Sequence, residues 1–181
     1  MTRCQRWREK RDSYRPAGEP IDTSKYGVDL VPESLAKAFV CHHHYSGTYP
    51  AARCRVGLFR WGGELVGVAV FSVPANKHVI RAWTGVDAGV ELGRFVLTDD
   101  VPANGETWFL SRAFKQVRKA LPELQAVISY SDPVRRRSAA GAIVLPGHTG
   151  TIYQANNGRY LGRSKKRIVV LAPDGKVLSP R

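Results

Sequence analysis

The sequence has little cysteine and no long apolar run. Only three of the 181 residues are cysteine (Cys4, Cys41 and Cys54), and no two of them form a CxxC pair. This pattern excludes a disulfide framework and a zinc knuckle, and it fits a reducing compartment. No apolar stretch approaches the length of a membrane span, and the first residues are charged, unlike a secretory signal. We therefore expect a cytoplasmic protein.

Acidic residues are also scarce. The chain has 15 Asp and Glu against 28 Lys and Arg, which gives a formal net charge of +13. Such a cationic field attracts polyanions, and nucleic acid is the usual partner. An anionic membrane surface is the competing partner, but no basic amphipathic helix or lipidation motif supports it. A generic basic surface is the plain alternative.

Composition and length favour one folded domain. Apolar residues make up 43% of the chain, which is enough to bury a core. We expect a single catalytic domain over 29–181, preceded by a basic lead-in over 1–28. In the lead-in, Pro16, Gly18 and Pro20 interrupt any helix. The lead-in is either a DNA-contacting arm or a solvated tail, and the sequence leaves both open.

Apolar periodicity and turn residues predict the order of elements. A mixed α/β or α+β layer follows from it, with a strand, turn, helix, strand unit at its centre. We expect residues 74–88 to be mainly loop and residues 134–147 to be an inserted loop. The expected elements are a helix from Pro32 into His42–Tyr45, a hairpin of Arg53–Arg60 with Leu65–Val73, a strand at Val90–Leu97, a helix at Glu106–Ala120, a strand at Gln125–Tyr130, a short helix at Thr149–Asn156, and a terminal hairpin from Ile168 that turns at Pro173-Asp174-Gly175.

Two carboxylates lie on or beside expected strands. Glu91 and Arg94 share one strand, and residues three apart face opposite sides unless a bulge intervenes. Glu91 is therefore either a general base in a cleft or an edge carboxylate paired with an arginine. Asp132 follows the carboxyl end of the next strand, where ligands gather in open α/β sheets, but Asp before Pro is also a common turn residue.

The turn over residues 99–105 opens a helix. Free backbone N–H groups at such a start bind phosphate or carboxylate, with Asn104 as a cap and Gly105 allowing close approach. A nucleotide-like cofactor fits this geometry, although Asp99, Asp100 and Glu106 oppose an anion there. An ordinary connection is the alternative.

Histidine and tyrosine supply the other candidate groups. Neighbouring residues on a helix point about 100° apart, so the run His42–His44 does not converge on one metal ion, and a metal site stays undecided. His44 is better suited to moving protons or contacting a base, with His148 as a possible partner. Tyr153 offers a hydrogen-bond donor or a stacking ring, or it packs a helix onto the sheet. The strongest phosphate-contact candidates are Arg159, Arg163, Lys165, Lys166 and Arg167.

These blocks together resemble a known family. The tract ELGRFVLTDDVPANGETWFLSRAFKQVRKALPELQAVISYSDP, followed by GHTGTIYQANNGRYLG, resembles the Mom-like DNA-modification proteins of phages, and HHHYSGTYPAARCRVGLF resembles the entry to their first hairpin. The resemblance covers roughly residues 29–163. It implies a phage-encoded enzyme of the host-cell cytoplasm, with a fold like the GNAT acyltransferases: a central mixed sheet with splayed strands, flanked by helices.

The resemblance also implies an activity and a set of site residues. The activity is conversion of adenine in double-stranded DNA to an N6-carbamoylmethyl form, which protects phage DNA from restriction. The implied catalytic residues are Asp132, His44, Ser111, Tyr153 and Glu91. The implied cofactor-binding residues are Leu97, Val101, Asn104, Gly105, Thr107 and Arg112. The implied DNA-binding residues are Arg53, Arg94, Arg135, Arg136, His148, Arg163, Lys165 and Lys166.

One departure from the superfamily concerns the donor. The usual acyl-CoA loop is replaced by VPANGE, so acetyl-CoA or a related acyl donor is possible but not specified. Two other functions stay open: an acetyl-CoA-dependent N-acetyltransferase acting on a modified base or a protein, and a non-enzymatic DNA-binding protein. The sequence does not predict an oligomeric state.

Overall fold

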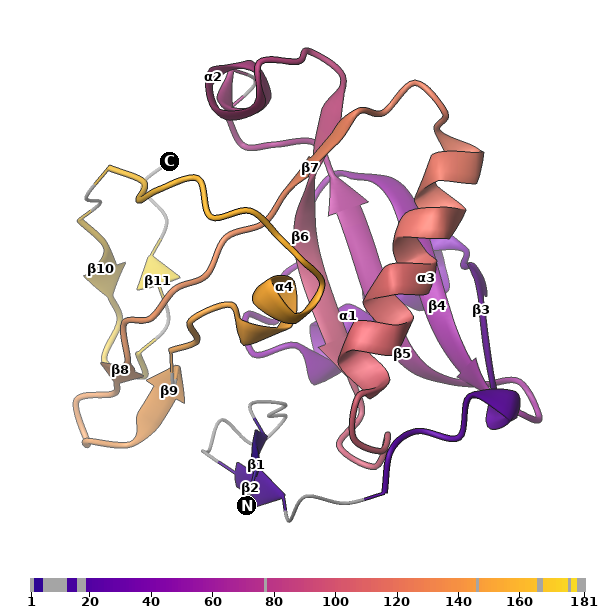
Figure 1. The fold of residues 1–181 in the computed structure, drawn as a ribbon. Helices are drawn as coiled ribbons and strands as arrows, with labels where there is room; N and C mark the ends of the chain where they lie inside the picture. Colours follow the sequence, from indigo (N-terminus) through magenta and orange to yellow (C-terminus); the bar gives the residue numbers. More distant parts are fainter. Residues whose placement is uncertain are drawn as a thin grey trace.

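The centre of the protein is a curled five-stranded mixed sheet. The computed structural model describes residues 2–4, 13–15, 19–76, 78–145, 147–165, 168–175 and 177–178. The strand order is β3-β4-β5-β6-β7; β3 to β6 are antiparallel neighbours, and β6 and β7 are parallel (Figure 1). The strands are β3 (Tyr26–Leu30), β4 (Ala52–Arg60), β5 (Glu64–Ser72), β6 (Gly89–Leu97) and β7 (Ala126–Ile128).

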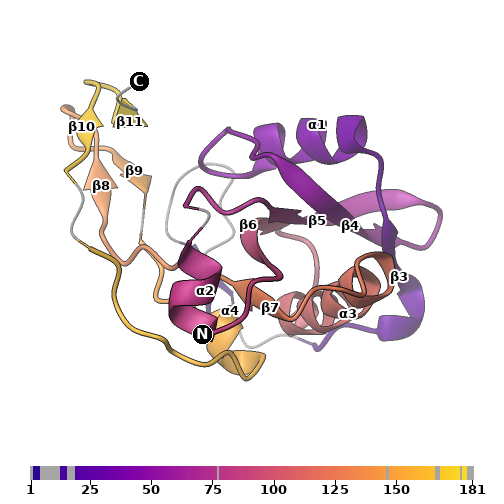
Figure 2. The same cartoon turned by 90° about the horizontal axis from the view of Figure 1, so that it is seen from above.

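Helices cover both faces of this sheet. Helix α1 (Glu33–His43) buries Ala36, Phe39 and Val40 against one face, and α3 (Gly105–Ala120) packs on the other (Figure 2). Alternate residues of β5 serve the two cores, because successive side chains of a strand point to opposite faces. The mixed helix and sheet layers expected from the sequence are confirmed. Within the described ranges, no helix is long and apolar enough to cross a membrane.

Shorter elements surround the sheet. Helix α2 (Val79–Thr84) contacts β7, and α4 (Thr151–Ala155) contacts α3. A hydrogen bond of 3.0 Å from Ala139 N to Pro173 O joins the two hairpins near the C-terminus. The remaining elements are η1 (Thr23–Lys25) and the pairs β1 (Thr2–Cys4) with β2 (Ser13–Arg15), β8 (Arg136–Arg137) with β9 (Ile143–Leu145), and β10 (Val170–Leu171) with β11 (Val177–Leu178).

Three local predictions were wrong or incomplete. Residues 74–88 contain helix α2, which buries Ile80 and ends at Gly85 in the left-handed region (φ 76°). The expected loop 134–147 contains the β8–β9 hairpin. Strand β3 begins at Tyr26, inside the expected lead-in, because its pairing with β4 forms the edge of the sheet. The predicted strand Gln125–Tyr130 is confirmed but shorter, as β7.

Candidate functional site

Strands β6 and β7 separate after three residue pairs. Their register runs from Gly89 opposite Ala126 to Glu91 opposite Ile128 and then stops. Strand β6 continues to Leu97 beside β5, while the chain beyond β7 leaves the sheet. The two strands therefore diverge beyond Glu91 and Ile128, and we call the place where they diverge the opening.

A β-bulge at Gly93 sets the face of two charged side chains. Val70 pairs with Arg94 and Phe71 pairs with Leu92, so Gly93 is an extra residue in β6. A Cβ atom at Gly93 would overlap the Ser72 hydroxyl, so a larger residue here would have to displace that side chain. The bulge shifts the alternation by one residue, so Glu91 and Arg94 lie on the same face, toward α1.

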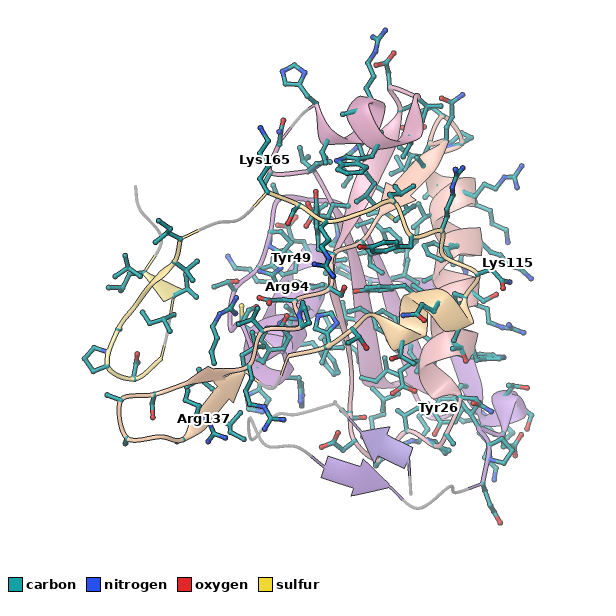
Figure 3. All side chains as sticks on the ribbon, turned by 60° about the vertical axis from the view of Figure 1, so that its left-hand side comes forward. Tyr26, Tyr49, Arg94, Lys115, Arg137 and Lys165 are labelled. Atoms are coloured by element: carbon teal, nitrogen blue, oxygen red, sulfur yellow. The ribbon has the colours of Figure 1, made fainter. Side chains whose placement is uncertain are left out.

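The guanidinium of Arg94 is held by the loop after α1 (Figure 3). Its Nε donates to Thr48 O (2.9 Å), Nη2 donates to Thr48 Oγ1 (2.6 Å) and Nη1 donates to Gly93 O (2.5 Å). Burial lowers the pKa of Arg94, and the neighbouring Tyr45 and Glu91 oppose that shift. Burial also raises the pKa of Glu91, which makes its carboxylate more basic than usual. Arg94 thus braces the site and is turned inward rather than displayed on the surface.

Asp132 lies at the start of the segment that carries α4. One carboxylate oxygen accepts from the guanidinium of Arg136 and the other accepts from Val134 N (3.1 Å). Its backbone carbonyl accepts from His148 N (2.8 Å). Burial lowers the pKa of His148, and the charge of Asp132 opposes this shift. These contacts bring Asp132, Arg136 and His148 together, and Asp132 and Arg136 lie near Tyr45.

His44 has a defined tautomer. The backbone N–H of Ser46 donates to His44 Nδ1 (3.1 Å), and the Ser46 hydroxyl lies 2.9 Å from the same atom. A backbone N–H only donates, so Nδ1 carries a lone pair and the ring proton of neutral His44 is on Nε2. Burial, and then the charges of Arg94 and His148, lower the pKa of His44 to about 3. Neutral His44 is therefore a hydrogen-bond donor through Nε2.

Tyr153 of α4 packs beside the core on the α3 side of the sheet. Its ring packs against the core beneath α3 and lies 6.5 Å, centroid to centroid, from the ring of His148. Burial, and then the neighbouring Tyr45 and Glu91, raise the pKa of Tyr153 to about 12. Glu91 and Tyr45 thus lie close enough to Tyr153 to influence its phenol. At neutral pH this phenol is protonated and serves as a donor.

A second feature is an open groove of about 750 Å³ between α3 and α4. The guanidinium of Arg112 lies 4.4 Å from the ring centroid of Trp108, and Trp108 Nε1 is buried without a hydrogen-bond partner among the described residues. A ligand with an acceptor atom would satisfy this N–H. The lining residues are Pro20, Ile21, Asn104, Thr107, Trp108, Ser111, Arg112, Phe114 and Ala155–Asn157.

The sequence-predicted residues fall into separate places. Asp132, His44, Glu91, Arg94, Arg136, His148 and Tyr153 gather at the opening, whereas Ser111, Asn104, Thr107 and Arg112 line the groove. The side chains of Leu97 and Val101 are buried in the core, as is Gly105. Among the expected DNA-binding residues, Arg53 pairs with Glu123. Three others, Arg135, Arg163 and Lys165, are exposed, and Lys166 lies outside the described residues. The part of the chain that the structure describes holds no group of three metal-ligating side chains.

Three contributing residues were not predicted. Tyr45, Ser46 and Trp108 carry no motif of their own, and each acquires its role through a neighbour. The sequence did carry one signal for Ser46. It is a short polar residue two positions after His44, and such residues often form local hydrogen bonds in turns.

Comparison with known proteins gives two matches. The family model described as "Mom protein family" matches residues 25–181. The protein named "Methylcarbamoylase mom" from Escherichia phage Mu is 30% identical over 139 residues, which is 75% of this chain and 53% of that protein. The chain thus spans about half the length of this relative.

Proposed function

The chain belongs to the Mom protein family, and from this premise we propose that it modifies adenine in DNA by adding a carbamoylmethyl-type group at N6. The match over residues 25–181 carries the proposal. The opening between β6 and β7 supports it, because it collects proton donors and acceptors in one place. The same opening supports a GNAT-like arrangement of the catalytic domain.

The chemistry requires an exposed base and a proton acceptor. The N6 lone pair of adenine is delocalised into the ring, and the amine is stacked within the duplex, so the base must be extruded. When N6 attacks an electrophilic carbon of the donor, the N–C bond forms and the leaving group departs with its bonding electron pair. The N6 proton passes to a carboxylate of the protein.

The two carboxylates at the opening suit different roles. Both oxygens of Asp132 already accept hydrogen bonds, from Arg136 and Val134 N, which orients the group to hold the adenine amine. Glu91 has its pKa raised by burial, so it is the stronger base and takes the proton. The phenol of Tyr153 donates to the leaving group or to the donor carbonyl.

We assign the donor to the groove between α3 and α4. Its lining fits a polar, partly planar donor, since Arg112 offers a cation and Trp108 Nε1 needs an acceptor. Ser111 and Asn104 would position that molecule. The groove borders α4, so the reactive carbon of the donor would extend past Tyr153 to meet the base at the opening.

The test is mass spectrometry of the nucleosides in cellular DNA. Cells expressing the protein should contain a heavier deoxyadenosine, detected by digestion of total DNA and mass spectrometry, and cells with empty vector should not. Normal deoxyadenosine alone, in cells with abundant folded protein that binds DNA, would identify a binding protein instead.

His44 is expected to act as a donor to the base edge, not as a base. A Gln side chain can supply an N–H in place of Nε2–H, so His44→Gln should stay within about tenfold of the wild-type level of modified deoxyadenosine. His44→Ala leaves the acceptor on the base edge without a donor, so the level of modified deoxyadenosine should fall by about 10- to 100-fold. Equal losses in the two variants, at equal protein levels, would assign proton transfer to His44.

A further inference from the structure

The positive charge is not spread evenly along the chain. Residues 19–132, which hold the whole five-stranded sheet, contain twelve basic and twelve acidic residues. Residues 133–181 contain ten basic residues and one acidic residue, Asp174. The segment that follows Asp132 therefore carries +9 of the net +13, and the sheet and the helices α1, α2 and α3 are neutral in sum.

In the neutral part, acidic neighbours compensate the charge of several basic residues. Arg53 pairs with Glu123, Arg55 with Glu33, and Arg60 with Glu64 and Asp100. Between Pro133 and Pro173 the chain has no acidic residue that could do the same. Within that segment, Arg136 pairs with Asp132, and Arg159, Arg163 and Lys165 are exposed.

The cationic segment forms two arms around the site. The first arm is the β8–β9 hairpin with Arg135–Arg137, which leaves the fold at Asp132 and returns at His148. The second arm is the stretch 159–165, with exposed Arg159, Arg163 and Lys165, which follows directly after α4 and Tyr153. Figure 3 shows Arg137 and Lys165 on the same side of the molecule, with Arg94 between them.

Backbone contacts help to hold both arms, and in the first arm Arg137 Nη1 also donates to Gly141 O (2.8 Å). Gly158 N donates to Tyr153 O (2.8 Å) at the start of the second arm, and a Cβ atom at Gly162 would lie 3.1 Å from the ring of Trp83, so the arm runs close to α2. In the first arm, Ser138 N donates to Ala142 O (2.8 Å). The backbone of both arms is thus positioned, and Arg159, Arg163 and Lys165 are exposed on the second arm.

We propose that duplex DNA docks across this face, with the β8–β9 hairpin contacting phosphates on one side of the target base and residues 159–165 contacting phosphates on the other. This inference rests on the proposed function for the identity of the polyanion. Phosphate contacts supply most of the sequence-independent affinity, and they position the duplex without reading its sequence. The arrangement would present the extruded base between the arms, at the opening lined by Asp132, His148 and Tyr153.

The test compares two triple variants that remove equal charge. Arg159→Gln/Arg163→Gln/Lys165→Gln neutralises the second arm, and Lys115→Gln/Arg118→Gln/Lys119→Gln neutralises three exposed residues of α3. Binding to a fluorescent 20-base-pair duplex is measured by anisotropy over a salt series. The slope of log K against log salt is negative, and in the arm variant it should become less steep by about 3, because each lost phosphate contact removes about 0.9 from its magnitude. The α3 variant should keep the wild-type slope.

The outcomes separate the docking face from the chemistry. Equal slopes in both triple variants would overturn the docking face, even where the wild type still modifies DNA. A lowered slope in the arm variant alone, with no modified nucleoside from the wild type, would keep the docking face and reject the proposed function. Binding of wild type to phosphatidylserine vesicles but not to the duplex would also overturn the inference. The single change Arg137→Gln tests the first arm, with an expected slope change of about 1.

Discussion

Replacing Asp132 by Asn is expected to reduce the modified deoxyadenosine in expressing cells by about 100-fold, the order expected for losing a hydrogen bond to a charged group. The amide keeps the size of the side chain, but it loses the charge that binds Arg136 and the full acceptor capacity that would hold the adenine amine. The measurement is the ratio of modified to total deoxyadenosine by mass spectrometry, at matched protein levels.

A second variant separates catalysis from folding. Asp132→Asn leaves Arg136, whose side chain is 21% exposed, without its ion-pair partner, and this costs stability. Asp132→Asn/Arg136→Gln removes that unpaired cation and should recover the thermal midpoint without recovering modification. Wild-type modification by either variant would exclude Asp132 from the reaction.

Replacing Glu91 by Gln is expected to lower the modification rate by about 100-fold or more, because the amide cannot accept a proton. The rate is followed in lysates of expressing cells, which supply the donor, after addition of unmodified plasmid at a series of pH values. The base works only when deprotonated, and burial raises its pKa above the ordinary carboxyl value. The wild-type rate should therefore fall as the pH falls through this raised pKa.

The pH profile distinguishes a proton acceptor from a structural carboxylate. Glu91→Asp keeps a carboxylate on a shorter side chain, so it should be slower but retain the fall at low pH. Glu91→Gln should lose that fall along with the rate. A Glu91→Gln protein with the wild-type rate and profile would show that another group takes the proton.

Long periodic elements were predictable because their own side chains carry the signal. The alternation of apolar residues on β4 and β5 and the helical spacing on α3 correspond directly to buried faces. Strand β3 and helix α2 escaped prediction for the opposite reason. Each is short, and each is stabilised by what it packs on: β3 by its ladder with β4, and α2 by the burial of Ile80 near β7.

The candidate site shows the same division at the level of single atoms. Spacing alone put Glu91 and Arg94 on opposite faces, and the bulge at Gly93 reverses that arrangement. The type of residue left His44 open as a proton-transfer group or as a contact to a base, whereas the hydrogen bond from Ser46 N makes neutral His44 a donor through Nε2. The hydroxyl of Ser111 could serve either at the opening or in the groove, and the fold places it in the groove, apart from Asp132.

The amino-acid sequence by itself determined the cationic character, the order of the main helices and strands, and the family motifs, because each of these depends on residue type or on short-range spacing. Only the tertiary structure decided that His44, Glu91, Asp132 and Tyr153 meet at one opening. These residues come from four separate elements or loops, and their meeting depends on the order of strands in the sheet and on where the pairing of β6 with β7 stops. No local pattern encodes such contacts, since they join residues far apart in the chain.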